Sequence, residues 1–197
     1  MKVLSLHYLP NVMWMKNLLS GNCIIDVHEH FVKQTYRNRA VILSANGPLN
    51  LTIPVKKTGE KMPMKALMPN NEVNWQRQHW ESIVTAYGSS PYFIHYEDGF
   101  KRIYEKPVTL IAAFELELLE LIIRYMKVDV QVILSDSYIA SPATDLRPSI
   151  SPKNDTVHAY FKPYLQVFAG KFPFHSNLSI LDALFNLGPR TVDILGS

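Results

Sequence analysis

The sequence predicts an α/β fold, a single domain over residues 1–197 with a mostly parallel central sheet, an inserted antiparallel hairpin and covering helices. Three observations predict it. Residues 3–27 read as strand, helix and strand, an order typical of a parallel βαβ unit. Residues 36–57 read as two alternating strands around a turn, and residues 74–125 contain apolar side chains at helical spacing.

The N-terminal unit begins with a strand predicted over Val3–His7, followed by a helix over Val12–Ser20. Gly21 and the asparagine after it are typical of a helix C-terminus. Cys23–Val27 is continuously apolar except for one aspartate, so we expect a strand that is buried on both faces.

The hairpin is predicted from Asn46-Gly47, which lies between two alternating apolar runs. Both residues of an Asn-Gly pair tolerate positive φ, so we expect them to be the central residues of the turn. A hairpin brings its outer ends together, so residues 37–39 should lie near residues 54–57.

The remaining elements are less regular. A long irregular segment is expected over residues 135–162, and segments of this kind in compact domains are often functional. The last helix should begin at Ser179, with Asp182 approximating a capping box. The other predicted elements are helices over 74–87, 93–104 and 108–125 and strands over 130–134 and 164–169.

Composition narrows the possible classes of protein. A net charge of +3, with the basic residues scattered along the chain, does not indicate a nucleic-acid partner. Glutamates interrupt the apolar run 111–125, which is also too short to span a bilayer. The N-terminus does not resemble a signal peptide, and Cys23 is the only cysteine. We therefore expect a cytoplasmic protein. The sequence identifies neither a cofactor nor an oligomeric state.

Candidate site residues cluster at strand ends. His7 follows the first strand, and ligands of open α/β sheets bind at the carboxyl ends of strands, so His7 is a candidate general base. The alternative is a capping or packing histidine before the proline-containing turn. Arg37 and Arg39 should point the same way and could bind a phosphate or carboxylate; the alternative is an exposed basic edge that protects against aggregation. At the last helix, Asp182 is either an acid/base group or a cap, and Asn177 precedes it.

Three further histidines have alternative explanations. His28 and His30 would share a face on a strand and, with a third ligand, could hold zinc, although no partner motif has suitable spacing. A polar strand end is the plainer explanation. His79 lies on an apolar helix face, where a histidine is more often a hydrogen-bonded core residue than a functional one.

Several short motifs of this chain resemble motifs of the WbqC-like family. They are His7-Tyr8-Leu9-Pro10, His28-Glu29-His30, Tyr36-Arg37-Asn38-Arg39, Asn46-Gly47, Ile53-Pro54-Val55, His79-Trp80, Ser90-Pro91-Tyr92-Phe93, Pro163-Tyr164-Leu165-Gln166, Asn177-Leu178-Ser179-Ile180-Leu181-Asp182 and Asn186-Leu187-Gly188-Pro189. The resemblance implies a bacterial protein associated with surface-polysaccharide (O-antigen or capsule) biosynthesis.

From the residues and the resemblance together we expect transfer of an acyl or aminoacyl group to an amino sugar of a glycan precursor. The donor would be a small-molecule nucleotide sugar or acyl donor. His7 and Asp182 would be catalytic, and the residues expected to bind substrate are Tyr8, Arg37, Asn38, Arg39, His79 and Asn177. The alternatives are a non-catalytic binding or assembly protein of the same pathway, and a metal-dependent hydrolase.

Overall fold

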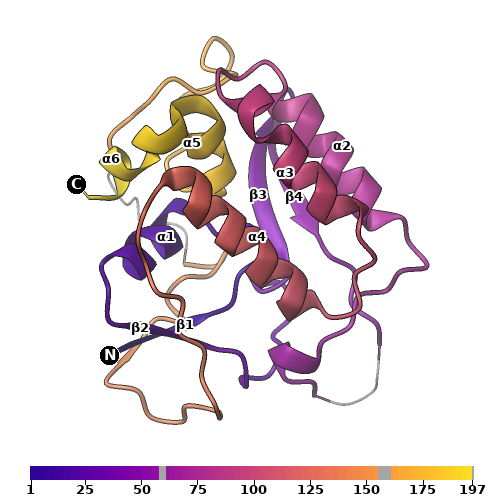
Figure 1. Ribbon diagram of the computed structural model, residues 1–197, viewed down its shortest axis with the longest axis vertical. Coiled ribbons are helices and arrows are strands. Elements are labelled where there is room, and N and C mark those ends of the chain that lie inside the picture. The colour runs from indigo at the N-terminus through magenta and orange to yellow at the C-terminus, as the bar shows by residue number, and fades with distance from the viewer. Residues whose placement is uncertain (58–60, 155–160, 197) are drawn as a thin grey trace.

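The computed structural model describes residues 1–57, 61–154 and 161–196 and has the predicted α/β class (Figure 1). A three-stranded parallel sheet and a separate antiparallel hairpin are accompanied by helices. The elements are β1 Lys2–Ser5, α1 Val12–Leu19, β2 Cys23–Asp26, β3 Arg39–Ser44, β4 Gly47–Thr52, η1 Met64–Ala66, α2 Trp75–Tyr87, α3 Phe93–Glu105, α4 Ile111–Met126, β5 Thr144–Asp145, α5 Ile180–Leu187, η2 Gly188–Thr191 and α6 Val192–Leu195.

The parallel sheet has the strand order β2-β1-β5. The predicted βαβ unit is confirmed, since β1 and β2 pair in parallel with Ser5 opposite Asp26. The chain places β2 on one side of β1 and β5 on the other. Strand order therefore reverses at β1, and this topological switch is where open α/β sheets form ligand crevices.

Two predicted strands are wrong. Residues 130–134 form only one bridge, in which Leu134 lies beside Ile25 of β2. Residues 164–169 are irregular and end in turns. The third strand is instead β5, two exposed residues that pair with β1 and have no apolar pattern of their own.

The hairpin forms, but the prediction of its turn is wrong by one residue. Ser44 pairs with Gly47, so Ala45 and Asn46 are the central residues. Pro48 explains the shift: an Asn46-Gly47 turn would require the amide hydrogen that proline lacks. In the observed register Pro48 lies opposite Leu43, whose own N–H points away to the Tyr87 hydroxyl at 3.2 Å.

Helices α4 and α5 begin where a partner is available for an amide of their first turn. The predicted helix 108–125 starts later, at Ile111, because Leu110 has extended backbone and the Ile111 N–H donates to the Leu67 carbonyl. Ser179 caps α5 through its hydroxyl, as expected. The capping-box role of Asp182 is wrong, because its carboxylate accepts hydrogen bonds from Tyr164 and Gln166 instead.

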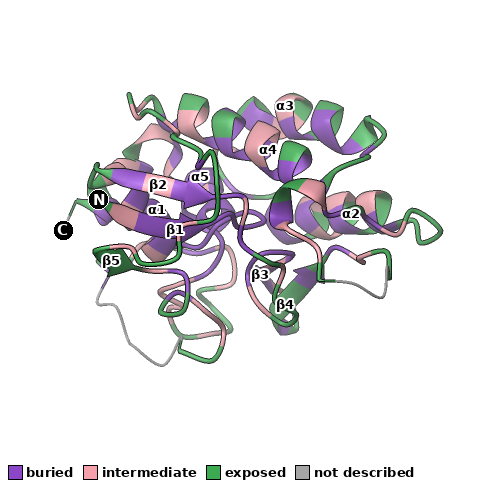
Figure 2. Ribbon diagram, turned by 90° about the horizontal axis from the view of Figure 1, so that it is seen from below, coloured by how far each residue is buried: buried purple, intermediate pink, exposed green. Residues whose placement is uncertain are grey.

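Buried side chains from the sheet, the hairpin and the helices form a common core (Figure 2). Helix α2 packs on β3 of the hairpin, while α1 contacts α5 and α6. In the part of the chain that the structure describes, no helix has the length and hydrophobicity needed to cross a membrane.

Candidate functional site

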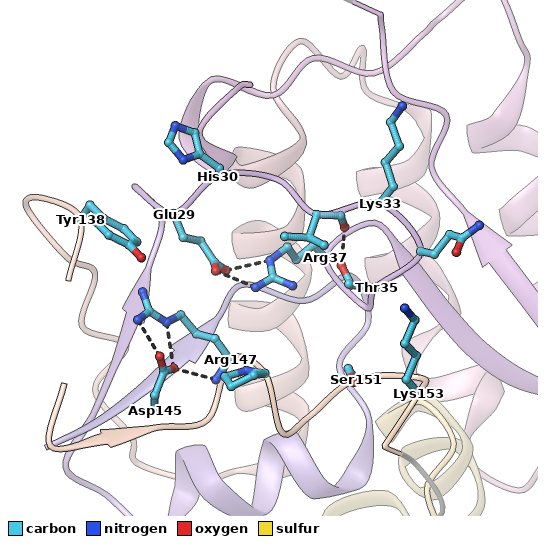
Figure 3. A pocket seen from close by; sticks show the side chains of 13 residues that line it. Glu29, His30, Lys33, Thr35, Arg37, Tyr138, Asp145, Arg147, Ser151 and Lys153 are labelled. Carbon is cyan, nitrogen blue, oxygen red and sulfur yellow. Dashed lines mark hydrogen bonds and ion pairs between the residues drawn. The ribbon is translucent and has the colours of Figure 1, made fainter. Parts of the chain in front are cut away.

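A cavity of about 490 Å³ opens near the carboxyl ends of β2 and β5 (Figure 3). The segment after β2 contributes Glu29 and His30, and β5 and the turn after it contribute Asp145 and Arg147. Arg37, from the turn before β3, completes this wall. The cavity volume lies in the range of small-molecule sites, and its place at the sheet edge is where such sites form.

Glu29 and Arg37 form a buried, bidentate ion pair in this wall. Arg37 Nε donates to Glu29 Oε1 at 2.9 Å, and Arg37 Nη2 donates to Oε2 at 2.6 Å. Both side chains are 7% exposed. A fork of two parallel hydrogen bonds fixes both groups in orientation, so Arg37 is a rigid part of the cavity.

Arg147 links the ends of β2 and β5. Its Nε and Nη2 donate to the two oxygens of Asp145 at 2.8 and 2.7 Å, and its Nη1 donates to Asp26 Oδ2 at 2.6 Å. The hydrogen bonds from Arg147 lower the pKa of the Asp145 carboxyl, and Asp145 in turn raises the pKa of Arg147. Both groups are therefore charged at neutral pH.

Asp26, the last residue of β2, orders the segments around the cavity. Its Oδ1 accepts the backbone N–H groups of His28 and Glu29 at 3.0 and 3.1 Å and the Ser135 hydroxyl at 3.0 Å. Its Oδ2 accepts the Ile139 N–H at 3.3 Å. Asp26 thus positions both the turn that carries Glu29 and the loop that carries Tyr138.

Most residues that line the cavity are of polar types, and basic side chains outnumber acidic ones. Lys33 and Lys153 line it in addition to the two arginines, against the carboxylates Glu29 and Asp145. Neither lysine forms an ion pair with a described residue. The excess of basic side chains favours an anionic ligand.

His7 is buried and is not among the residues that line the cavity. Its ring lies 5.6 Å from that of Tyr36 and 5.9 Å from that of Trp14. Burial, reinforced by the charge of Arg37, holds the pKa of His7 well below its usual value, so the imidazole is neutral. Its Nδ1 has no hydrogen-bond partner among the described residues.

Tyr8 and His79 belong to a second buried group. The Tyr8 hydroxyl lies 2.9 Å from His79 Nδ1 and 2.5 Å from the Tyr104 hydroxyl. Burial lowers the pKa of His79 to about 4, although a hydrogen bond to the backbone of Thr52 opposes this. His79 is therefore a neutral core histidine whose ring nitrogens contact Tyr8 and Thr52.

Two of the other predicted binding residues, Asn38 and Asn177, hold neighbouring elements together, whereas Arg39 does not line the cavity. Asn38 donates to the Ile53 carbonyl at 2.8 Å and ties the open end of the hairpin. Arg39 starts β3, outside the cavity lining, and its buried Nε has no partner among the described residues. Asn177 accepts the Met13 N–H at 3.0 Å in the first turn of α1.

Asp182 lies in a separate network on α5. Its Oδ1 accepts the Tyr164 hydroxyl at 2.7 Å and the Gln166 amide at 2.8 Å. Burial raises the pKa of this carboxyl despite those hydrogen bonds. Of the predicted site residues His7, Arg37 and Asp182, the structure places Arg37 in the cavity lining and leaves the other two outside it.

His28 and His30 separate after β2 and are not on a strand. His28 Nδ1 lies 3.2 Å from the Ser135 hydroxyl, and His30 lines the cavity. Within residues 1–57, 61–154 and 161–196, no three His, Cys, Asp or Glu side chains are grouped as metal ligands. The third ligand that a zinc site with these histidines requires is not found there.

Sequence reasoning missed most of the cavity wall, including Glu29, Asp145, Arg147 and Tyr138. Two signals could have found part of it. Asp26 is a charged residue at the end of an apolar strand, and Asp145-Leu146-Arg147 lies in the irregular segment 135–162. Charged residues in these positions are typical of a strand-end site.

The family model for the WbqC-like protein family matches residues 7–154, most of the chain. The chain belongs to the WbqC-like protein family. The matched segment contains His7 and the whole cavity wall, and it ends before Asn177 and Asp182. No curated protein matches the chain, and no solved structure does.

Proposed function

We propose that this WbqC-like protein is a bacterial, cytoplasmic enzyme of surface-glycan precursor biosynthesis that transfers an acyl or aminoacyl group to an amino sugar. The cavity at the carboxyl edge of the sheet is the observation that carries the proposal. It lies within the family segment, and its lining has an excess of basic side chains. A nucleotide sugar or an anionic acyl donor has the complementary charge.

In this reaction the amine nitrogen of the sugar attacks the carbonyl carbon of the donor. A C–N bond forms, the bond between that carbon and the donor's leaving group breaks, and the amine loses a proton. In this proposal His7 is the base that accepts this proton: its imidazole is neutral and its Nδ1 has no partner among the described residues, but it lies behind the cavity lining and has to reach the amine through that wall. The basic lining of the cavity would hold the anionic substrate.

The proposed roles of Asp182 and Asn177 stay predictions. In this proposal they orient the acceptor from the start of α5. The interactions that support a structural role instead are the hydrogen bonds of Asp182 to Tyr164 and Gln166 and that of Asn177 to α1.

The test is the set of glycan precursors in cells that lack the protein. We expect an unmodified amino-sugar precursor to accumulate, and the wild-type gene to reverse the accumulation. Lys33→Ala combined with Lys153→Ala should fail to reverse it, whereas Lys101→Ala, an exposed lysine on α3, should succeed. Unchanged precursors with altered glycan assembly would contradict the transferase and favour the non-catalytic role.

A further inference from the structure

The Glu29–Arg37 ion pair separates two chemically different ends of the cavity. Figure 3 shows Lys33 and Lys153 on one side of Arg37, and Tyr138 on the other side beyond Glu29. One end is therefore cationic and the other is aromatic. A ligand that fills the cavity must offer a matching group to each end.

The cationic end has donors that no protein group uses. Arg37 binds Glu29 through Nε and Nη2, and its Nη1 has no hydrogen-bond partner among the described residues. Lys33 and Lys153 form no ion pair with described residues either. An oriented guanidinium and two exposed ammonium groups in one cavity suit a multiply charged phosphate better than a single carboxylate.

The aromatic end is held in place by its neighbours. Tyr138 is 56% exposed, and its ring centroid lies 5.3 Å from the guanidinium carbon of Arg147. The next residue, Ile139, is fixed on both sides: its N–H donates to Asp26, and its carbonyl accepts from Arg147 Nη2 at 2.9 Å. An exposed aromatic ring on a fixed loop is a stacking platform for another ring.

We propose that this cavity binds a nucleoside diphosphate group, with the phosphates among Lys33, Lys153 and Arg37 Nη1 and the base stacked on Tyr138. The inference rests on the proposed function and names the part of the substrate that the cavity recognises. A phosphopantetheine group would use the cationic end but carries no ring for Tyr138. The two ends together therefore select a nucleotide-linked substrate.

Binding to the purified full-length chain tests the proposal. Calorimetry at one fixed salt concentration would compare uridine diphosphate, adenosine diphosphate, inorganic pyrophosphate and phosphopantetheine. Both nucleotides should bind roughly tenfold or more tightly than pyrophosphate, because stacking of one base on an aromatic side chain contributes that much. Phosphopantetheine should bind no better than pyrophosphate.

Three variants separate the two ends. Tyr138→Ala should weaken nucleotide binding roughly tenfold and leave pyrophosphate binding unchanged, while Tyr138→Phe should bind nucleotides as the wild type does. Lys33→Ala should weaken all phosphate probes together, and the matched control Lys101→Ala should weaken none. Saturation transfer from the protein to the base protons gives a second readout on the unmodified chain.

Equal affinity for pyrophosphate and the nucleotides would overturn the proposal. So would tighter binding of phosphopantetheine, an equal effect of Tyr138→Ala on all probes, or no saturation transfer to the base. The proposed function fails separately: nucleotide binding with unchanged glycan precursors would reject the transferase and keep this site. Accumulated precursor with no nucleotide binding would reject the nucleotide site and keep the transferase.

Discussion

Replacing Glu115 by glutamine should stabilise the protein at neutral pH. Glu115 lies on α4, is 1% exposed, and neither carboxylate oxygen has a hydrogen-bond partner among the described residues. Burial raises the pKa of this carboxyl well above its ordinary value of 4.5. The folded protein therefore keeps a proton on Glu115 at a pH where the unfolded chain has lost it.

The sign of the pH dependence follows from proton binding. Above pH 4.5 the folded state binds more protons at this position than the unfolded state, so stability falls as the pH rises. The slope is up to about 1.4 kcal/mol per pH unit, which accumulates to on the order of 2–3 kcal/mol two units higher. Glutamine has a similar volume and cannot ionise, so this loss disappears in Glu115→Gln.

Urea unfolding followed by tryptophan fluorescence, at several pH values between 4 and 7, measures the effect. The free energies of unfolding of the wild type and Glu115→Gln should agree within about 1 kcal/mol at pH 4 and diverge by about 2–3 kcal/mol near pH 6.5. Glu120→Gln is the matched control, because Glu120 lies on the same helix and is exposed. The reasoning is refuted if the two variants have the same pH profile, or if Glu115→Gln is the less stable protein at pH 6.5.

Two further perturbations test the packing around the site and at the end of α5. Arg37→Met leaves the buried Glu29 carboxylate unpaired and should lower the free energy of unfolding by about 3–5 kcal/mol. Adding Glu29→Gln to this variant should recover part of the loss. A double variant less stable than Arg37→Met alone would contradict this. Gly188 has φ +61°, and a methyl group there would collide with the Tyr92 ring, so Gly188→Ala should lower the free energy of unfolding by about 2–4 kcal/mol. Gly170 is the control, because a Cβ there would meet no atom within 4 Å, and Gly170→Ala should change the free energy of unfolding by less than about 0.5 kcal/mol. Equal effects of the two alanine substitutions in the same urea assay would refute the steric argument.

The sequence could predict elements whose signal is local. The strand Cys23–Asp26 was expected to within one residue, because its apolar run is continuous and Gly21 precedes it. The two residues of β5 have no such run, and they become a strand only by pairing with β1. Tertiary contact, not local preference, decides an element of that length.

The same distinction explains the candidate site. His7 and Arg37 were each singled out from the sequence, because a strand end and a hairpin end can both be recognised locally. Arg147 bonds to Asp26 across 121 positions of sequence, a pairing that no spacing in one chain reveals. The cavity wall was missed because it depends on that pairing.

The four basic residues of the cavity have two different roles, and this division can be measured. Arg37 and Arg147 are buried against carboxylates, so removing either should reduce stability as well as binding. Lys33 and Lys153 are exposed, so removing either should reduce binding alone. The paired arginines then determine the shape of the cavity, and the unpaired lysines supply the charge that remains for a ligand. A lysine variant that lost stability to the same extent as an arginine variant would show that this division of roles is wrong.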